Sequence, residues 1–237
     1  MKFTLVCLII IFICSNLLIS TTNALSYEKS SLGQDISWPN CNNLKFKPLN
    51  FGIVGVNGGL SFHPNPCLSE EALLYRQNLS LYVNTGFPGS PYDIKFKSVP
   101  NECSIKDVNC LAYNYGFNAG KYSADYALTN GVVSNNWWLD VETDNSWSNS
   151  PSNNIYSLIG EIAAINQSLK PNLIGIYSTP AQWQVLTYNW KNYLPEWLAT
   201  NSNYKYVAYS ACKVKSFTGG KIILAQYIGK TDLDLVC

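Results

Sequence analysis

The sequence contains very few of the side chains on which metal and nucleic-acid sites depend. It has one histidine, His63, one arginine, Arg76, and one methionine, the initiator, in 237 residues. A lone imidazole cannot build a multi-histidine metal site, and a proline-flanked histidine is a poor base for a serine or cysteine triad. The 16 basic residues are balanced by 15 acidic ones. Without a basic excess or an arginine cluster, we expect no nucleic-acid partner.

Charge of either sign is also scarce, whereas apolar and aromatic residues are abundant. Charged residues make up 13% of the chain, hydrophobic residues 47% and aromatic residues 14%. That composition excludes a disordered chain and suits one globular domain with a substantial core. Any chemistry must come from carboxylates, hydroxyls or aromatic rings, and we expect neither a metal nor an organic cofactor.

The first 24 residues have the order of a secretory signal peptide. Lys2 precedes an apolar run over 3–13, and Thr22-Asn23-Ala24 resembles a small-residue cleavage site. A membrane anchor is the alternative, but Ser15 and Asn16 interrupt the run short of the roughly 20 apolar residues that a spanning helix needs. We therefore expect a signal peptide over 1–24 and a secreted domain over 25–237, with no membrane anchor after cleavage. We expect this mature chain to be monomeric.

Cysteine usage supports an oxidising compartment. Two of the eight cysteines belong to the signal segment, and six remain, at Cys41, Cys67, Cys103, Cys110, Cys212 and Cys237. An even number in an exported chain predicts three disulfides. The sequence alone leaves many pairings open, of which we favour neighbours in order because they close short local loops. Asn78 and Asn166 begin sequons, so the secreted chain is a candidate glycoprotein.

Short strand-like runs alternate with helix-like stretches, which predicts an α/β fold with a largely parallel sheet. The strand candidates are 33–37, 51–57, 79–85, 137–142, 173–178, 196–200, 204–210 and 222–228. The helix candidates are 69–77, 115–128, 155–169 and 181–188. Eight strands favour a single TIM-like β/α barrel, irregular and with fewer than eight helices. An open doubly wound sheet remains the alternative.

Two acidic residues end the fourth predicted strand. On a strand, residues two apart share a face about 6.6 Å apart, so Asp140 and Glu142 should lie side by side at the carboxyl end of that strand. In a barrel that end forms the active-site rim. Close carboxylates in a partly apolar setting raise each other's proton affinity, so one can stay protonated as an acid while the other stays charged. Glycoside hydrolysis needs this division of labour.

Further acids and aromatic rings occur near other strand ends. Asp35 ends the first predicted strand, and Asp232 and Asp234 follow the last one. First and last strands are neighbours in a closed barrel, so these acids could converge with Asp140 and Glu142 on one cleft. Flat rings suitable for stacking on sugars are Trp38, Trp137, Trp138, Tyr177 and Tyr227.

These segments together resemble the family 25 glycoside hydrolases, the Ch-type lysozymes. The motifs that carry the resemblance are Asp35-Ile36-Ser37, Asp140-Val141-Glu142, Tyr177-Ser178 and Gln226-Tyr227 followed by Asp232. The chain looks still more like a less characterised branch of secreted barrels, through 35–41, 54–59, 137–142, 177–179 and 217–220. Two features depart from typical lysozymes, namely the turn Trp38-Pro39-Asn40-Cys41 and the six cysteines.

The resemblance implies a role for each candidate site residue. Glu142 would be the general acid, and Asp140 would stabilise the positive anomeric centre directly or orient an N-acetyl group to do so. Asp35 and Asp232 would line the cleft and tune this pair. The residues expected to contact the sugar are Trp38, Trp138, Tyr177, Tyr227 and Asn57.

We therefore expect a secreted glycosidase that cleaves the β-1,4 bond of an amino-sugar polymer, with peptidoglycan as the first candidate. One alternative is a glycan-binding or wall-associated barrel that has lost turnover. Another is a chitinase, but Trp138 occupies the position two residues before Asp140 where a chitinase would have a further aspartate.

Overall fold

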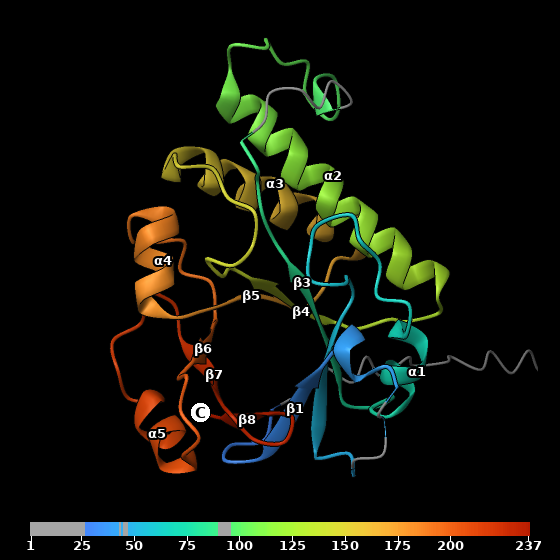
Figure 1. Ribbon diagram of the computed structural model, residues 1–237, viewed down its shortest axis with the longest axis vertical. Coiled ribbons are helices and arrows are strands. Elements are labelled where there is room, and N and C mark those ends of the chain that lie inside the picture. The colour runs from blue at the N-terminus through green and yellow to red at the C-terminus, as the bar shows by residue number, and fades with distance from the viewer. Residues whose placement is uncertain (1–26, 43, 45–46, 90–95) are drawn as a thin grey trace, which may run out of the picture.

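The structure is a computed structural model that describes residues 27–42, 44, 47–89 and 96–237. The predicted signal peptide over 1–24 lies outside the described residues. Eight strands close into one barrel in chain order (Figure 1). The strands are β1 (Leu32–Ile36), β2 (Phe51–Gly55), β3 (Leu79–Asn84), β4 (Asn136–Asp140), β5 (Leu173–Ser178), β6 (Glu196–Ala199), β7 (Ile222–Tyr227) and β8 (Asp232–Val236).

Helices cover the outside of the barrel. They are α1 (Leu68–Leu73), α2 (Val108–Thr129), α3 (Pro151–Leu169), α4 (Pro180–Thr187) and α5 (Lys205–Ala211), with a short 3-10 helix, η1, over Trp38–Asn40. The predicted barrel with fewer than eight helices is thus confirmed. No helix in the described ranges is long and apolar enough to cross a membrane.

The last strand departs from the expected pattern. Strands β1 to β7 run parallel, but β8 pairs antiparallel with both β7 and β1. Because β8 enters the barrel from the opposite end, its first residue lies beside the carboxyl end of β1, and Asp35 is paired with Asp232. The acids at 232 and 234 therefore belong to the last strand itself and do not follow it.

The predicted strand over 204–210 is wrong, because this segment forms α5. Its tyrosines gave it strand-like composition, but Tyr206 and Tyr209 are exposed while Ala208 and Ala211 are buried against the barrel. A spacing of three residues between buried positions is the pattern of a helix face. The tyrosines of this segment lie on the exposed surface. Packing of its alanines against the barrel favours a helix over a strand.

Helices α2 and α3 lie against each other in an unusually close contact, visible in Figure 1 as the green and olive helices. A Cβ built on Gly116 would be 1.8 Å from the carbonyl oxygen of Ser157, and one built on Gly160 would be 2.1 Å from that of Tyr113. Only glycine allows this backbone approach.

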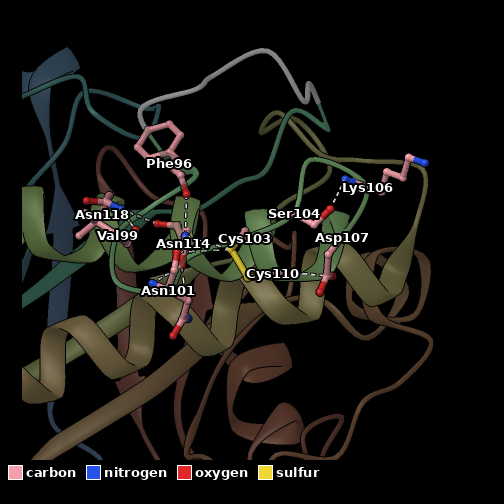
Figure 2. Close-up of a disulfide and its surroundings, with 10 residues drawn as sticks. All are labelled: Phe96, Val99, Asn101, Cys103, Ser104, Lys106, Asp107, Cys110, Asn114 and Asn118. Atoms are coloured by element: carbon pink, nitrogen blue, oxygen red, sulfur yellow. Dashed lines mark hydrogen bonds between the residues drawn. A yellow bond between two sulfur atoms is a disulfide. The ribbon is translucent and has the colours of Figure 1, made fainter.

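All three disulfides join cysteines that are neighbours in order, as favoured. Cys41–Cys67 links the segment after β1 to the start of α1, and Cys212–Cys237 ties α5 to the end of β8. Cys103–Cys110 closes the turn before α2 (Figure 2). There Asp107 caps the helix by accepting from the Cys110 N–H at 3.1 Å. Asn114 secures the preceding loop by donating to the carbonyls of Phe96 and Asn101 at 2.6 and 2.7 Å.

Candidate active site

A polar cavity of about 210 Å³ opens at the end of the barrel where the parallel strands finish. Its lining is drawn from strand ends and the loops after them: Asp35, Ser37, Trp38, Gly59, Tyr82, Asn84, Asp140, Glu142, Tyr177, Trp197, Gln226 and Asp232. Four of the five acids predicted to converge therefore do so, whereas Asp234 does not line the cavity. The antiparallel β8 makes this possible, since it delivers Asp232 at its beginning instead of its end.

Asp140 lies on the cavity wall at the end of β4 and is only 4% exposed. Its Oδ2 accepts a short hydrogen bond from the Asn84 side chain, and its backbone oxygen accepts from the Thr85 hydroxyl at 2.6 Å. Its other carboxyl oxygen, Oδ1, meets no N–H or hydroxyl donor in the described residues. Burial, followed by the charge of Glu142, raises the pKa of Asp140 well above its usual value.

Glu142 is half-buried beside Asp140, and the two carboxyl groups hydrogen-bond to each other. Trp147 fixes its backbone by donating from Nε1 to the Glu142 carbonyl at 2.7 Å. Burial raises the pKa of Glu142, and the charges of Asp144 and Asp232 act in the same direction. A hydrogen bond between two carboxyl groups requires a proton, so this pair holds one proton where two charges would repel.

Asp35 and Asp232 face this pair from β1 and β8. Burial and then the charge of Asp232 raise the pKa of Asp35 to about 7, and burial raises that of Asp232. Gln226 donates from Nε2 to the Asp35 carboxylate at 2.9 Å and accepts from the Tyr177 hydroxyl at 2.8 Å. Four titratable acids with raised pKa values in one cavity are typical of a site for acid and base chemistry.

The predicted sugar-contacting residues divide into two groups. Trp38, which is 49% exposed, and Tyr177 both line the cavity. Trp138 does not, because it points into the barrel one layer lower, where it is fully buried against Trp197. Tyr227 is on the outer face of the sheet. Successive strand residues face opposite sides, so it is the neighbouring Gln226 that reaches the cavity.

Asn57 is buried and acts at one remove from the cavity. Its amide accepts from the backbone N–H of Asn84 and donates to the Asn84 carbonyl, both at 2.9 Å. It thereby fixes Asn84, which in turn holds Asp140. Sequence reasoning named Asn57 as a contact residue and missed Asn84. The signal available was the alternation Ser80, Tyr82, Asn84 on a strand with one inward face.

Trp197 and Tyr82 were also missed, and both lie on inward positions of predicted strands. Aromatic residues on inward positions can lie either in the core or on the cavity wall, and the strand pattern does not distinguish the two. Most of the barrel below the cavity is filled with such rings. There Trp138, Trp197 and Tyr177 pack ring to ring.

The sequence matches no protein-family model, and no curated protein matches it. Solved structures do resemble it. A muramidase from Trichobolus zukalii aligns with a TM-score of 0.53 and 16% identity over 87% of this chain and 93% of that one. A glycosyl hydrolase 25 of Streptococcus pneumoniae, described as a virulence factor, gives a TM-score of 0.53 and 16% identity over 87% of each chain. The catalytic domain of an endolysin from Listeria monocytogenes bacteriophage P40 gives 0.50 and 16%, over 90% and 95%.

These similarities confirm the resemblance to family 25 glycoside hydrolases at the level of the fold. The chain shares their barrel over nearly all of its described length. At 16% identity the likeness concerns the fold alone, and the chemistry must be argued from the cavity.

Proposed function

We propose that this protein is a secreted glycoside hydrolase that cleaves the β-1,4 bonds of an amino-sugar polymer, with peptidoglycan as the substrate. The observation that carries the proposal is the Asp140–Glu142 carboxyl pair, which shares a hydrogen bond on the wall of a cavity at the strand ends of a closed barrel. The barrel shared with a muramidase and an endolysin catalytic domain supports the choice of polymer.

In the proposed reaction Glu142 is the general acid. It is the more exposed member of the pair, and the shared proton, which burial favours on Asp140, passes to it through the hydrogen bond between the two carboxyl groups. As the glycosidic bond breaks, this proton moves to the leaving oxygen and the pair becomes doubly negative. The anomeric carbon becomes positive at the same moment, so Asp140 stabilises the transition state directly or through the N-acetyl group. Without that positive charge, burial makes the doubly ionised pair costly.

Asp35 and Asp232 form the opposite wall and tune the acid. The charge of Asp232 raises the pKa of Glu142, and the Gln226 bridge holds Asp35 in place. Trp38 offers an exposed indole at the rim on which a sugar ring can stack. We assign no step to a metal or an organic cofactor.

Secretion is part of the proposal and is supported by the predicted signal peptide and the three disulfides. Asn78 and Asn166 are exposed, on the loop before β3 and on α3, so both are candidate glycosylation sites. We further propose that the mature chain acts as a monomer.

The test is release of reducing ends from purified peptidoglycan, with chitin in parallel, by the disulfide-intact mature protein. Glu142→Gln should fold normally and lower the rate by about a thousandfold, because it keeps the shape of the acid without its proton. Glu70→Gln, an exposed glutamate on α1, is the matched control and should retain full activity.

Two results would contradict the proposal. One is equal activity of Glu142→Gln and the wild type. The other is no release from either polymer by folded wild-type protein, together with glycan binding that Glu142→Gln leaves unchanged. The second result would identify a glycan-binding barrel without turnover.

A further inference from the structure

One fully buried carboxyl group lies directly beneath the cavity and has no part in the reaction described above. Asp234 is on β8, two residues after Asp232, so both side chains point into the barrel. Asp234 is 0% exposed and does not line the cavity. Trp197 donates from Nε1 to its Oδ1 at 2.8 Å, while its Oδ2 meets no N–H or hydroxyl donor in the described ranges.

The carboxyl group of Asp234 hydrogen-bonds the carboxyl group of Asp35, so one of the two must carry a proton. Each of the two already accepts one N–H, so burial decides which one: Asp234 is fully buried, whereas Asp35 lines the cavity. The Tyr177 hydroxyl donates to Gln226, and Gln226 donates to Asp35. On its cavity side Asp35 can be solvated and bonded as an ion, whereas the charged form of Asp234 would be wholly buried, so the proton belongs on Asp234.

We propose that Asp234 is a positioning residue that stays protonated and donates to Asp35, so that Asp35 is the member of the pair that ionises on the cavity wall. Asp35 then receives hydrogen bonds from two sides, from Gln226 above and Asp234 below. Through Gln226 the same arrangement orients Tyr177, which lines the cavity.

The charges around Asp234 favour its neutral form. The groups that act on it are Asp35 and Asp232, both acidic, and the phenols of Tyr27, Tyr75 and Tyr227 respond to its charge. No cationic side chain is among them in the described part of the molecule. Burial raises the pKa of Asp234 well above its usual value, whereas that of Asp35 rises only to about 7, so Asp35 ionises first.

The test compares two substitutions that keep the branched shape of the side chain and differ in hydrogen bonding. Asp234→Asn can still donate to Asp35 and accept from Trp197, but it cannot ionise. Asp234→Leu keeps the branching at Cγ with larger methyl groups, and it does neither. If the proposal is correct, Asp234→Asn keeps the wild-type rate within about twofold and the same acidic limb of the pH–rate profile. Asp234→Leu should lose about tenfold to a hundredfold and move that limb upward by about one pH unit, because Asp35 loses a donor to its charged form.

Two further readouts do not depend on turnover. Infrared difference spectra of wild type against Asp234→Asn at neutral pH should show one buried protonated carboxyl group that the variant lacks. Carbon NMR of Asp35 should give a midpoint near that of the wild type in Asp234→Asn and a higher one in Asp234→Leu. If Asp234→Leu does not fold, the infrared difference and the Asp234→Asn titration still decide the question.

The kinetic comparison rests on the proposed function, but the two spectroscopic readouts do not. Their failure is therefore distinguishable from an absence of hydrolysis. The inference is overturned if the infrared difference is missing, or if Asp234→Asn shifts the Asp35 midpoint as far as Asp234→Leu does. It is also overturned if Asp234→Leu lowers only the melting temperature and leaves both pH profiles unchanged.

Discussion

The two ends of the barrel interior are built on the same strands but on opposite principles. At the lower end Tyr27 closes the barrel, packing edge-on against Phe51 with ring centroids 5.1 Å apart. Its hydroxyl hydrogen-bonds Ser80 Oγ at 2.6 Å and accepts from Trp138 Nε1 at 3.1 Å, so the polar groups of this plug are satisfied. At the upper end, Asp140 and Asp234 each keep a buried carboxyl oxygen without an N–H or hydroxyl donor.

The lower end of the barrel thus contributes stability, and the upper end carries the residues proposed for chemistry. Unsatisfied buried carboxyls destabilise a fold, whereas filled aromatic layers stabilise it. Burial at the upper end therefore favours the protonated form of its acids at a cost in stability. The aromatic packing at the lower end offsets that cost. Changes at the two ends should affect different measurements.

The largest effect on stability is expected at the lower end. Trp138 is fully buried and fits into the space left by Gly175, where a Cβ would be 2.3 Å from the indole ring. Trp138→Ala should lower the free energy of unfolding by about 3–5 kcal/mol. Chemical denaturation measures this, and Val133→Ala, an exposed position before β4, is a control that should change little. A loss of unfolding free energy below about 1 kcal/mol would show that this aromatic layer does not provide the main stabilisation of the barrel.

At the upper end a substitution should separate the two properties. Asp140→Asn replaces a buried acid, whose charged form the cavity disfavours, with a neutral amide, so we expect a gain in stability of about 1–3 kcal/mol at neutral pH. The same change removes the second carboxylate of the pair and should lower hydrolysis by about a hundredfold or more. Thermal unfolding and reducing-end release on one preparation test both. A simultaneous loss of both would mean that Asp140 holds the fold together.

The buried acids also predict how stability depends on pH. Burial raises the pKa of Asp35 from 3.8 and of Glu71 from 4.5, each to about 7. The native state therefore binds protons more tightly than the unfolded chain does, and the stabilisation is complete below about pH 4 and lost as pH rises through 7. Glu161, fully buried between α2 and α3, acts in the same direction.

We therefore expect the free energy of unfolding to fall by a few kcal/mol between pH 4 and pH 7. Denaturant titrations at several pH values measure this, with Glu71→Gln as the variant in which part of the dependence disappears. Rising stability over the same interval would contradict the raised pKa values of these acids.

The smallest effect is expected for Tyr27, which closes the lower end of the barrel. Tyr27→Phe keeps the ring against Phe51 but removes the hydroxyl that serves Ser80 and Trp138. The loss should be about 1–2 kcal/mol, since a hydrogen bond is lost and the Trp138 N–H is left unpaired. Activity should not change. A measurable fall in turnover without a fall in stability would show that the two ends are coupled.

Most of the strands and the acids could be predicted because both depend on local patterns. Runs of apolar residues located β1 to β7 apart from the segment that became α5, and the strand ends placed Asp35, Asp140 and Glu142 at one rim. The final strand escaped because its Asp-Leu-Asp-Leu alternation is inverted. Its carboxylates face inward and its leucines outward, which is the reverse of the pattern expected when polar residues face solvent.

The sequence by itself determined the α/β class, the six paired cysteines and the candidate acids of the cavity, and it favoured the barrel and the pairing of neighbouring cysteines, because alternation, chain order and short loop closure follow from residues close together in the chain. Only the tertiary structure decided that Gln226 and not Tyr227 faces the cavity, that Trp138 lies beneath it, and that Asp234 meets Asp35. These outcomes depend on strand direction and on which face of each strand turns inward. Closure of the whole sheet sets both, and no single segment contains that information.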